Sequence, residues 1–156
     1  MSTKLLSTQP VATKPAQPRG GVLRDDQSPL RARIDVDELI RRSYRRAHDL
    51  DDTVLVNLLK HNLGRPIVAR ITNTADPNTV SRWVSGRAKP EAETRARMRT
   101  AATVLLAVEE LVGSISSAAD WLTGKNPSLS FQMPAIALSE GRDAEVYGAL
   151  REIAEW

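Results

Sequence analysis

The chain has 156 residues, no cysteine and two histidines, and 41% of its residues are hydrophobic. This composition excludes disulfides and thiolate metal sites, and His48 and His61 are too isolated to form a ligand cluster, so we expect no metal and no cofactor. No apolar run approaches the ~20 residues of a membrane span, and the N-terminus lacks an apolar signal segment, so we expect a soluble, cytoplasmic protein without a membrane partner.

Charge is distributed unevenly along the chain, although the formal net charge is only +3. Residues 1–34 carry six basic and two acidic side chains, and residues 35–65 carry six of each. Residues 66–99 carry seven basic and three acidic side chains, whereas residues 100–156 carry three basic and eight acidic ones. We expect the basic part to be attracted to phosphate and the acidic part to meet a different partner.

The first 65 residues predict an arm followed by two helices. Residues 1–34 contain four prolines, a Gly-Gly pair and no periodic apolar pattern, which indicates a flexible basic arm. Apolar residues recur at helical spacing over residues 36–50 and 52–63, and Gly64 is suited to cap the second helix. The first helix has a basic face that either contacts phosphates or is an ordinary charged surface: Arg41, Arg42, Arg45 and Arg46.

The segment that follows, PIVARITNTADPNTVSRWVSGRAKP, predicts two short helices over residues 66–73 and 77–85, a tight turn between them and a basic loop after them. Asp76 is a favourable N-cap residue and Pro77 suits the first helical position. Val80, Trp83 and Val84 recur at helical spacing, so this face, with Trp83, is expected in the core. The pattern is that of a helix-turn-helix DNA-binding element.

The side chains left on the outer faces of the second helix, together with the basic loop, are the predicted DNA contacts: Asn78, Thr79, Ser81, Arg82, Ser85, Arg87 and Lys89. Asn78 and Thr79 lie in the first turn and would either read bases or simply cap the helix. Arg82 would contact a base or a phosphate, or pair with a nearby acid. Arg87 and Lys89 are expected to contact phosphates.

After Pro90, residues 91–116 predict one long helix with a continuous apolar stripe, which we expect to be the spine of the fold and a candidate dimer interface. Three short helices are predicted beyond it, over residues 117–123, 134–140 and 142–155. The chain is therefore expected to be all-α, with an arm (1–34), a helix-turn-helix domain with an extra N-terminal helix (35–99), and a helical C-terminal domain (100–156).

Two segments together resemble the Xre/MbcA/ParS-type antitoxins of toxin–antitoxin pairs. The first is DPNTVSRWVSGRAKP, with its R-W-x-x-G ending and the proline after the loop. The second is DWLTGKNPSLSFQMPAIALSEGRDAEVYGALREIAEW, with W-L ending a short helix, N-P-x-L, a proline opening the next helix and a final amphipathic helix. The resemblance covers about residues 52–156, and Ser130-Phe131 stands where a glycine-containing turn is usual in the family.

The resemblance implies a protein with two partners. The helix-turn-helix would bind double-stranded DNA at the operator of its own operon, and we expect the protein to bind there as a homodimer. The C-terminal domain would bind and block a toxin, usually one with a RES-type or ADP-ribosyltransferase-like fold that uses NAD. The implied toxin contacts are Asn126, Pro127, Arg142, Arg151, Glu155 and Trp156. Truncation from about residue 140 would then abolish neutralisation and leave operator binding largely intact.

Two other functions are weighed against the antitoxin. A stand-alone helix-turn-helix repressor of the phage type, whose C-terminal domain serves dimerisation, is the alternative, and a toxin-sized neighbouring gene would argue against it. An enzyme is not expected, because the sequence has no His or Ser constellation for nucleophilic catalysis and no phosphate-cradling loop.

Overall fold

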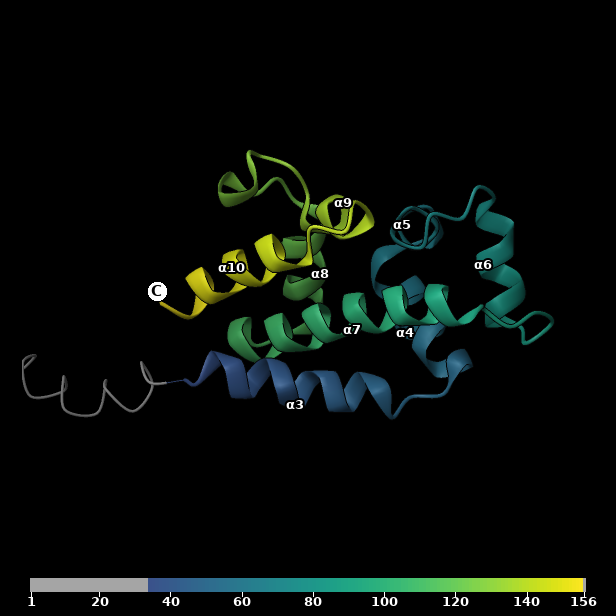
Figure 1. Ribbon diagram of the computed structural model, residues 1–156, viewed down its shortest axis with the longest axis horizontal. Coiled ribbons are helices and arrows are strands. Elements are labelled where there is room, and N and C mark those ends of the chain that lie inside the picture. The colour runs from purple at the N-terminus through teal and green to yellow at the C-terminus, as the bar shows by residue number, and fades with distance from the viewer. Residues whose placement is uncertain (1–33, 156) are drawn as a thin grey trace, which may run out of the picture. The chain divides into compact units, whose positions relative to one another are not determined.

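The computed structural model describes residues 34–155, so the predicted arm and Trp156 fall outside the described residues, Ile34 excepted. Between residues 34 and 155 every element is a helix, which confirms the all-α class (Figure 1). The elements are α3 (Val36–His48), α4 (Asp52–Leu63), α5 (Arg65–Ile71), α6 (Pro77–Val84), α7 (Ala92–Val112), α8 (Ile115–Thr123), the short 3₁₀ helix η3 (Pro127–Leu129), α9 (Pro134–Ser139) and α10 (Asp143–Ala154). None of these helices is long and apolar enough to cross a membrane.

Side-chain caps explain why several helices begin where they do. The Asp35 carboxylate accepts a hydrogen bond from the amide of Glu38 at 3.0 Å, and Asp51 accepts one from Val54 at 2.9 Å. Each cap satisfies an amide that the first turn of a helix leaves without a partner. The sequence-based boundaries of α3 and α4 therefore agree with the structure to within two residues.

The prediction of one helix over residues 91–116 is wrong at its C-terminal end. Gly113 adopts a left-handed conformation with φ 97° and ends α7. Ser114 then caps α8, because its side chain accepts a hydrogen bond from the amide of Ser117 at 3.1 Å. Glycine reaches this φ without a Cβ penalty, so the chain turns here although its apolar pattern continues.

The helix α7 is the spine of the described residues. Every side chain from Ala101 to Val108 is buried, because α3, α4, α8, α9 and α10 all contact α7. Figure 1 shows α3 lying along one side of α7 and α10 along another. A helix that is buried on all sides offers no stripe to a second copy. The suggested dimer interface along this helix is therefore unavailable over residues 101–108.

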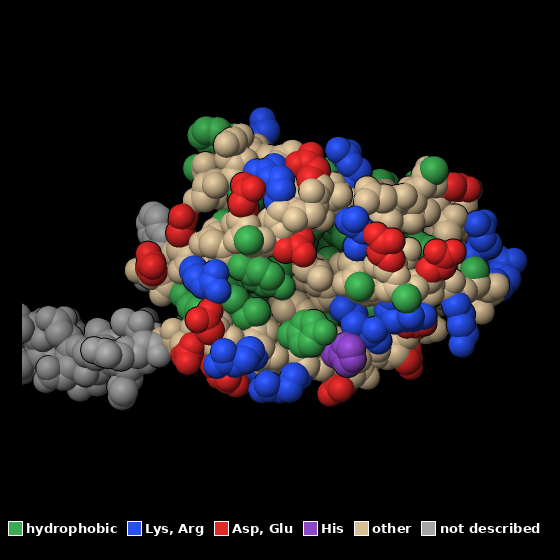
Figure 2. All heavy atoms as spheres, in the orientation of Figure 1, with side chains coloured by type: hydrophobic (Ala, Val, Ile, Leu, Met, Phe, Trp, Pro, Cys, Tyr) green, Lys and Arg blue, Asp and Glu red, His purple; other side chains and the backbone are tan. Residues whose placement is uncertain are grey.

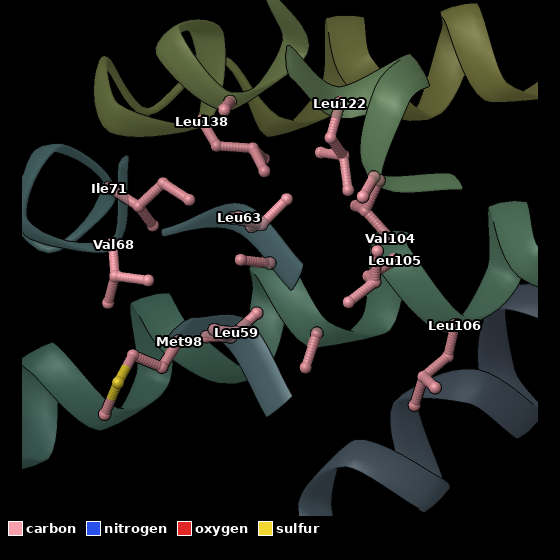
Figure 3. Packing of buried hydrophobic residues seen from close by; sticks show 14 of the residues in the cluster. Leu59, Leu63, Val68, Ile71, Met98, Val104, Leu105, Leu106, Leu122 and Leu138 are labelled. Carbon is pink, nitrogen blue, oxygen red and sulfur yellow. The ribbon is translucent and has the colours of Figure 1, made fainter. Parts of the chain in front are cut away.

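The hydrophobic core is continuous across α7. Figure 3 shows Val68 and Ile71 of α5 and Leu138 of α9 around the same cluster as Met98 and Leu105 of α7. Residues 35–155 form one compact unit. The boundary predicted between residues 99 and 100 falls inside α7, so helices on either side of it share one core.

We predict that Leu105→Ala, at a side chain with 0% exposure, lowers the free energy of unfolding by about 2–5 kcal/mol, because it leaves a cavity at the centre of the core. Urea unfolding followed by circular dichroism measures this change. Val112→Ala, at a side chain of the same helix that is 39% exposed, is the control and should cost less than about 1 kcal/mol. Equal losses for the two variants would contradict this description of the core.

Candidate nucleic-acid interface

A hydrogen-bonded turn separates α5 from α6. Asn73 follows the end of α5 with φ 57°, and its amide donates to the carbonyl of Arg70 at 3.1 Å. The next amide, that of Thr74, donates to the carbonyl of Ala69 at 2.8 Å. These two bonds form a Schellman motif, and asparagine is one of the few residues besides glycine that tolerates its left-handed position. The chain therefore reverses within residues 72–76 and brings α6 against α5.

A second Schellman motif ends α6 and positions the basic loop. Gly86 has φ 78°, its amide donates to the carbonyl of Trp83 at 3.2 Å, and the amide of Arg87 donates to the carbonyl of Arg82 at 2.9 Å. These bonds close the last turn of the helix. As a result, Arg87 and Lys89 lie in the loop directly after the C-terminal end of α6.

One face of α6 is buried and the other is exposed. Val80 is 0% exposed and Trp83 is 7% exposed, which confirms the prediction that Trp83 is a core residue. The Asp76 carboxylate caps the helix by accepting from the amide of Asn78 at 2.9 Å, so the Asn78 side chain is not the cap. Among the predicted DNA contacts, Thr79 and Ser81 are half-buried and the others are exposed: Asn78, Arg82, Ser85, Arg87 and Lys89.

Hydroxyl groups, rather than carboxylates, orient the arginines of this surface. Arg82 donates to the Thr79 hydroxyl at 2.9 Å, and Arg87 donates to the Ser85 hydroxyl at 3.4 Å. Neither guanidinium is within ion-pair distance of an acid among residues 34–155. Arg82 is thus bonded to the Thr79 hydroxyl and not to the acid that the sequence analysis considered. Its positive charge is therefore available for an anion.

Arg65 is a basic residue at this surface that the sequence analysis missed. Its guanidinium donates to the hydroxyl of Ser81 at 2.9 Å, so the first residue of α5 lies beside the outer face of α6. The predicted helix began at Pro66, one residue too late. An arginine directly before a proline that opens a helix is the signal that would have included it. Figure 2 shows basic side chains gathered over α6 and the following loop, at the right-hand edge.

An ion pair between the first turn of α7 and α4 lies next to the end of the basic loop. The Nε and Nη2 atoms of Arg95 donate to the two carboxylate oxygens of Asp52 at 2.7 and 3.0 Å, and Nη2 also donates to the carbonyl of Pro90 at 2.9 Å. Bidentate pairs of this kind fix geometry as well as charge. The Arg95 guanidinium holds the pKa of Asp52 below its ordinary value. Arg95 therefore supports the loop that carries Lys89.

The basic face of α3 is paired within the chain. Arg42 and Arg46 lie 2.6 and 3.6 Å from the carboxylate of Glu110 on α7. Arg41 and Arg45 lie 2.9 and 3.3 Å from the carboxylate of Glu38. Of the two explanations left open by the sequence, these contacts favour an ordinary charged helix face that is tied to α7.

The predicted toxin contacts fall in three places. Asn126 and Pro127 lie in the segment between α8 and α9, and Arg142 contacts that segment through Gln132. Arg142 also pairs with Glu140 at 3.0 Å and Glu145 at 2.8 Å, which raises the pKa of its guanidinium further above the ordinary value.

The remaining predicted toxin contacts lie on or beyond α10. Arg151 pairs with Asp37 of α3 at 2.8 Å, so its charge is also engaged within the chain. Glu155 is exposed at the end of α10, and Trp156 lies outside the described residues. Of the predicted basic toxin contacts, both arginines thus have acidic partners in their own chain.

Compared with known protein families, with curated proteins and with solved structures, the chain has no significant match. No group of three or more His, Asp or Glu side chains within the described residues could hold a metal ion.

We predict that Asp52→Asn lowers the Tm at pH 7 by about 2–4 °C, the equivalent of roughly 1 kcal/mol for a chain of this size. Arg95 lowers the pKa of Asp52 in the folded state. The pair therefore stabilises the fold at pH values above the ordinary Asp pKa of 3.8, and this stabilisation is lost as the pH falls through the lower pKa of the folded state. The Tm difference between wild type and variant should accordingly shrink as the pH is lowered below about 4, measured by thermal unfolding.

Asp51→Asn is the matched control for this measurement. It changes the neighbouring acid, keeps an equally good N-cap residue and leaves the Arg95 pair intact, so stability should change by no more than about 0.5 kcal/mol. A Tm difference for Asp52→Asn that stays constant from pH 7 to pH 2 would refute the assigned role of the pair.

Proposed function

We propose that this protein is an antitoxin that represses its own operon. The surface formed by α5, α6 and the following loop binds the operator as a helix-turn-helix, and the segment from α8 to α10 binds and blocks a toxin. The observation that carries the proposal is the separation, within one compact unit, of unneutralised arginines around α6 from the acidic C-terminal segment. The basic surface would attract DNA, and the acidic segment would attract a basic protein surface.

The features of α6 fit a recognition helix. Burial of Val80 and Trp83 fixes the helix on the domain, while the amide of Asn78 and the guanidinium of Arg82 face solvent. Such groups match the donor and acceptor pattern of base edges in the major groove. Arg65, beside Ser81 of α6, and Arg87, just after the end of α6, would contact the phosphate backbone and set the orientation of the helix. A homodimer would read two half-sites of a symmetric operator.

The charge of the C-terminal segment favours a partner other than DNA. Residues 100–156 carry eight acidic and three basic side chains. Three of these acids are paired with arginines, namely Glu110, Glu140 and Glu145, and five have no ion-pair partner among residues 34–155: Glu109, Asp120, Asp143, Glu152 and Glu155. This surface would repel phosphate and attract a basic surface. A toxin that uses NAD must accommodate a pyrophosphate with positive groups. An acidic protein surface would complement the charge of such a cleft. We expect both proteins to be cytoplasmic.

We predict that Arg87→Ala and Arg82→Ala weaken operator binding in different ways. Arg87→Ala should weaken binding to all sequences about equally and reduce the salt slope by ~0.9, because it removes one phosphate contact. Arg82→Ala should cost about 1–3 kcal/mol on the operator and relax sequence preference. Fluorescence anisotropy with the DNA upstream of the protein's own gene, at several salt concentrations, measures both effects.

Arg46→Ala is the control for the DNA measurement, because Arg46 is an arginine on α3 that is paired with Glu110. It should leave operator affinity and salt slope unchanged. If Arg46→Ala weakened binding as much as Arg87→Ala, or if the wild type bound operator no better than unrelated DNA, the assignment of α6 as the reader would be wrong.

We predict that Glu155→Lys weakens capture of the adjacent gene product and restores its toxicity, while operator binding is unchanged. The truncation from about residue 140 is not a clean test, because α10 contributes Val146 and Leu150, both 0% exposed, to the common core. Co-expression with the adjacent gene, pull-down and a growth assay measure the effect. Asp49→Lys, an exposed charge reversal at the end of α3, is the control and should behave as wild type.

Failure of the wild type to bind or neutralise the adjacent gene product would contradict the antitoxin proposal. The stand-alone repressor would then be the better explanation. Equal losses for Glu155→Lys and Asp49→Lys would show that the effect is one of net charge and not of the C-terminal surface.

A further inference from the structure

Two consecutive residues other than glycine adopt left-handed backbone conformations in the turn between η3 and α9. The amide of Gln132 donates to the carbonyl of Leu129 at 3.0 Å, and the two residues between them, Ser130 and Phe131, have φ 55° and 66°. A turn with both central residues at positive φ is of type I′, which strongly prefers Asn-Gly. A bulky aromatic residue in this conformation is a true outlier and stores strain.

The surrounding hydrogen bonds hold the turn in this conformation. The carbonyl of Asn126 accepts from the amides of Leu129 at 2.9 Å and Phe131 at 2.8 Å, and the amide of Asn126 donates to the carbonyl of Gln132 at 3.2 Å. The Gln132 side chain contacts Arg142 and lies 3.3 Å from a carboxylate oxygen of Glu140. The turn is therefore built into the segment and attached to α9 and α10.

The strained residue contributes almost nothing to the core. Leu129, two residues earlier, is 1% exposed, whereas Phe131 is 65% exposed, more than any other large hydrophobic side chain among residues 34–155. The turn borders an open hollow of about 540 Å³ lined by Leu129, Ser130, Phe131, Gln132 and Arg142. In Figure 2 a hydrophobic side chain stands at the upper left, over the segment between α8 and α9. Folding alone gives no reason to hold an aromatic ring there.

We propose that Phe131 is the apolar anchor of the interface with a protein partner, and that it enters an apolar pocket bordered by basic side chains. Aromatic side chains dominate binding energy where they fill such pockets. Glu152 contacts this segment through Ser128 and has no ion-pair partner among residues 34–155, whereas Glu140 is already paired with Arg142. The charge of Glu152 makes a basic border complementary and disfavours DNA and anionic lipid as occupants. The inference rests on the proposed function, in which this partner is the toxin.

Two glycine substitutions in the full-length chain separate the anchor from the strain. Ser130→Gly relieves the backbone at one position and keeps Phe131, so we expect the Tm to rise by about 2–4 °C and the Kd for the adjacent gene product to stay unchanged. Phe131→Gly relieves the backbone and removes the ring, so we expect a similar rise in Tm and a Kd about 30-fold higher. Thermal unfolding and isothermal titration calorimetry give the two readouts.

Tyr44→Ala, at an exposed aromatic residue of α3, is the control and should leave the Kd unchanged. The proposal is overturned if Phe131→Gly binds like wild type, if it lowers the Tm, or if its main effect is to dissociate a homodimer, as light scattering would reveal. If wild type itself does not bind the adjacent gene product, the proposed function fails and this inference fails with it. Binding by wild type with no effect of Phe131→Gly overturns this inference alone.

Discussion

Burial of the middle of α7 on every side is the constraint on which the other features depend. Side chains from Ala101 to Val108 are inaccessible because helices from both halves of the chain pack around them. Removing this much apolar surface from water is the main stabilising term for a helical fold with few aromatic residues. Because both halves of the chain pack around this helix, the proposed operator-binding surface and the acidic C-terminal segment belong to one packed unit. Loss of α10 would therefore remove part of the core beneath both.

The way arginines are held differs between parts of this unit. On α3, in the first turn of α7 and on α10, guanidinium groups pair with carboxylates, as Arg95 does with Asp52. Around α6 they meet hydroxyls instead, those of Thr79, Ser81 and Ser85. A hydroxyl orients a guanidinium without cancelling its charge, which leaves the charge for a phosphate. This contrast distinguishes the surface around α6 from arginine-rich surfaces that only stabilise the fold.

Left-handed residues show a similar contrast. Asn73 and Gly86 take this conformation at helix ends, where Schellman motifs require it and where these residue types bear it at little cost. Ser130 and Phe131 take it in a turn that would be satisfied better by Asn-Gly. The first two positions are explained by the local fold. The second pair is explained by what the exposed ring can bind, which is why the strain points to an interface.

The sequence by itself determined the features that depend on neighbours along the chain. Helical periodicity, the cap at Asp76 and the burial of Trp83 were all predictable, because periodicity and capping act within one or two turns. Only the tertiary structure decided which side chains and helices that lie far apart in the sequence contact each other. Arg42 finds Glu110, 68 residues away, and α3 covers the stripe suggested as a dimer interface. Such contacts depend on how helices pack, which local pattern does not encode.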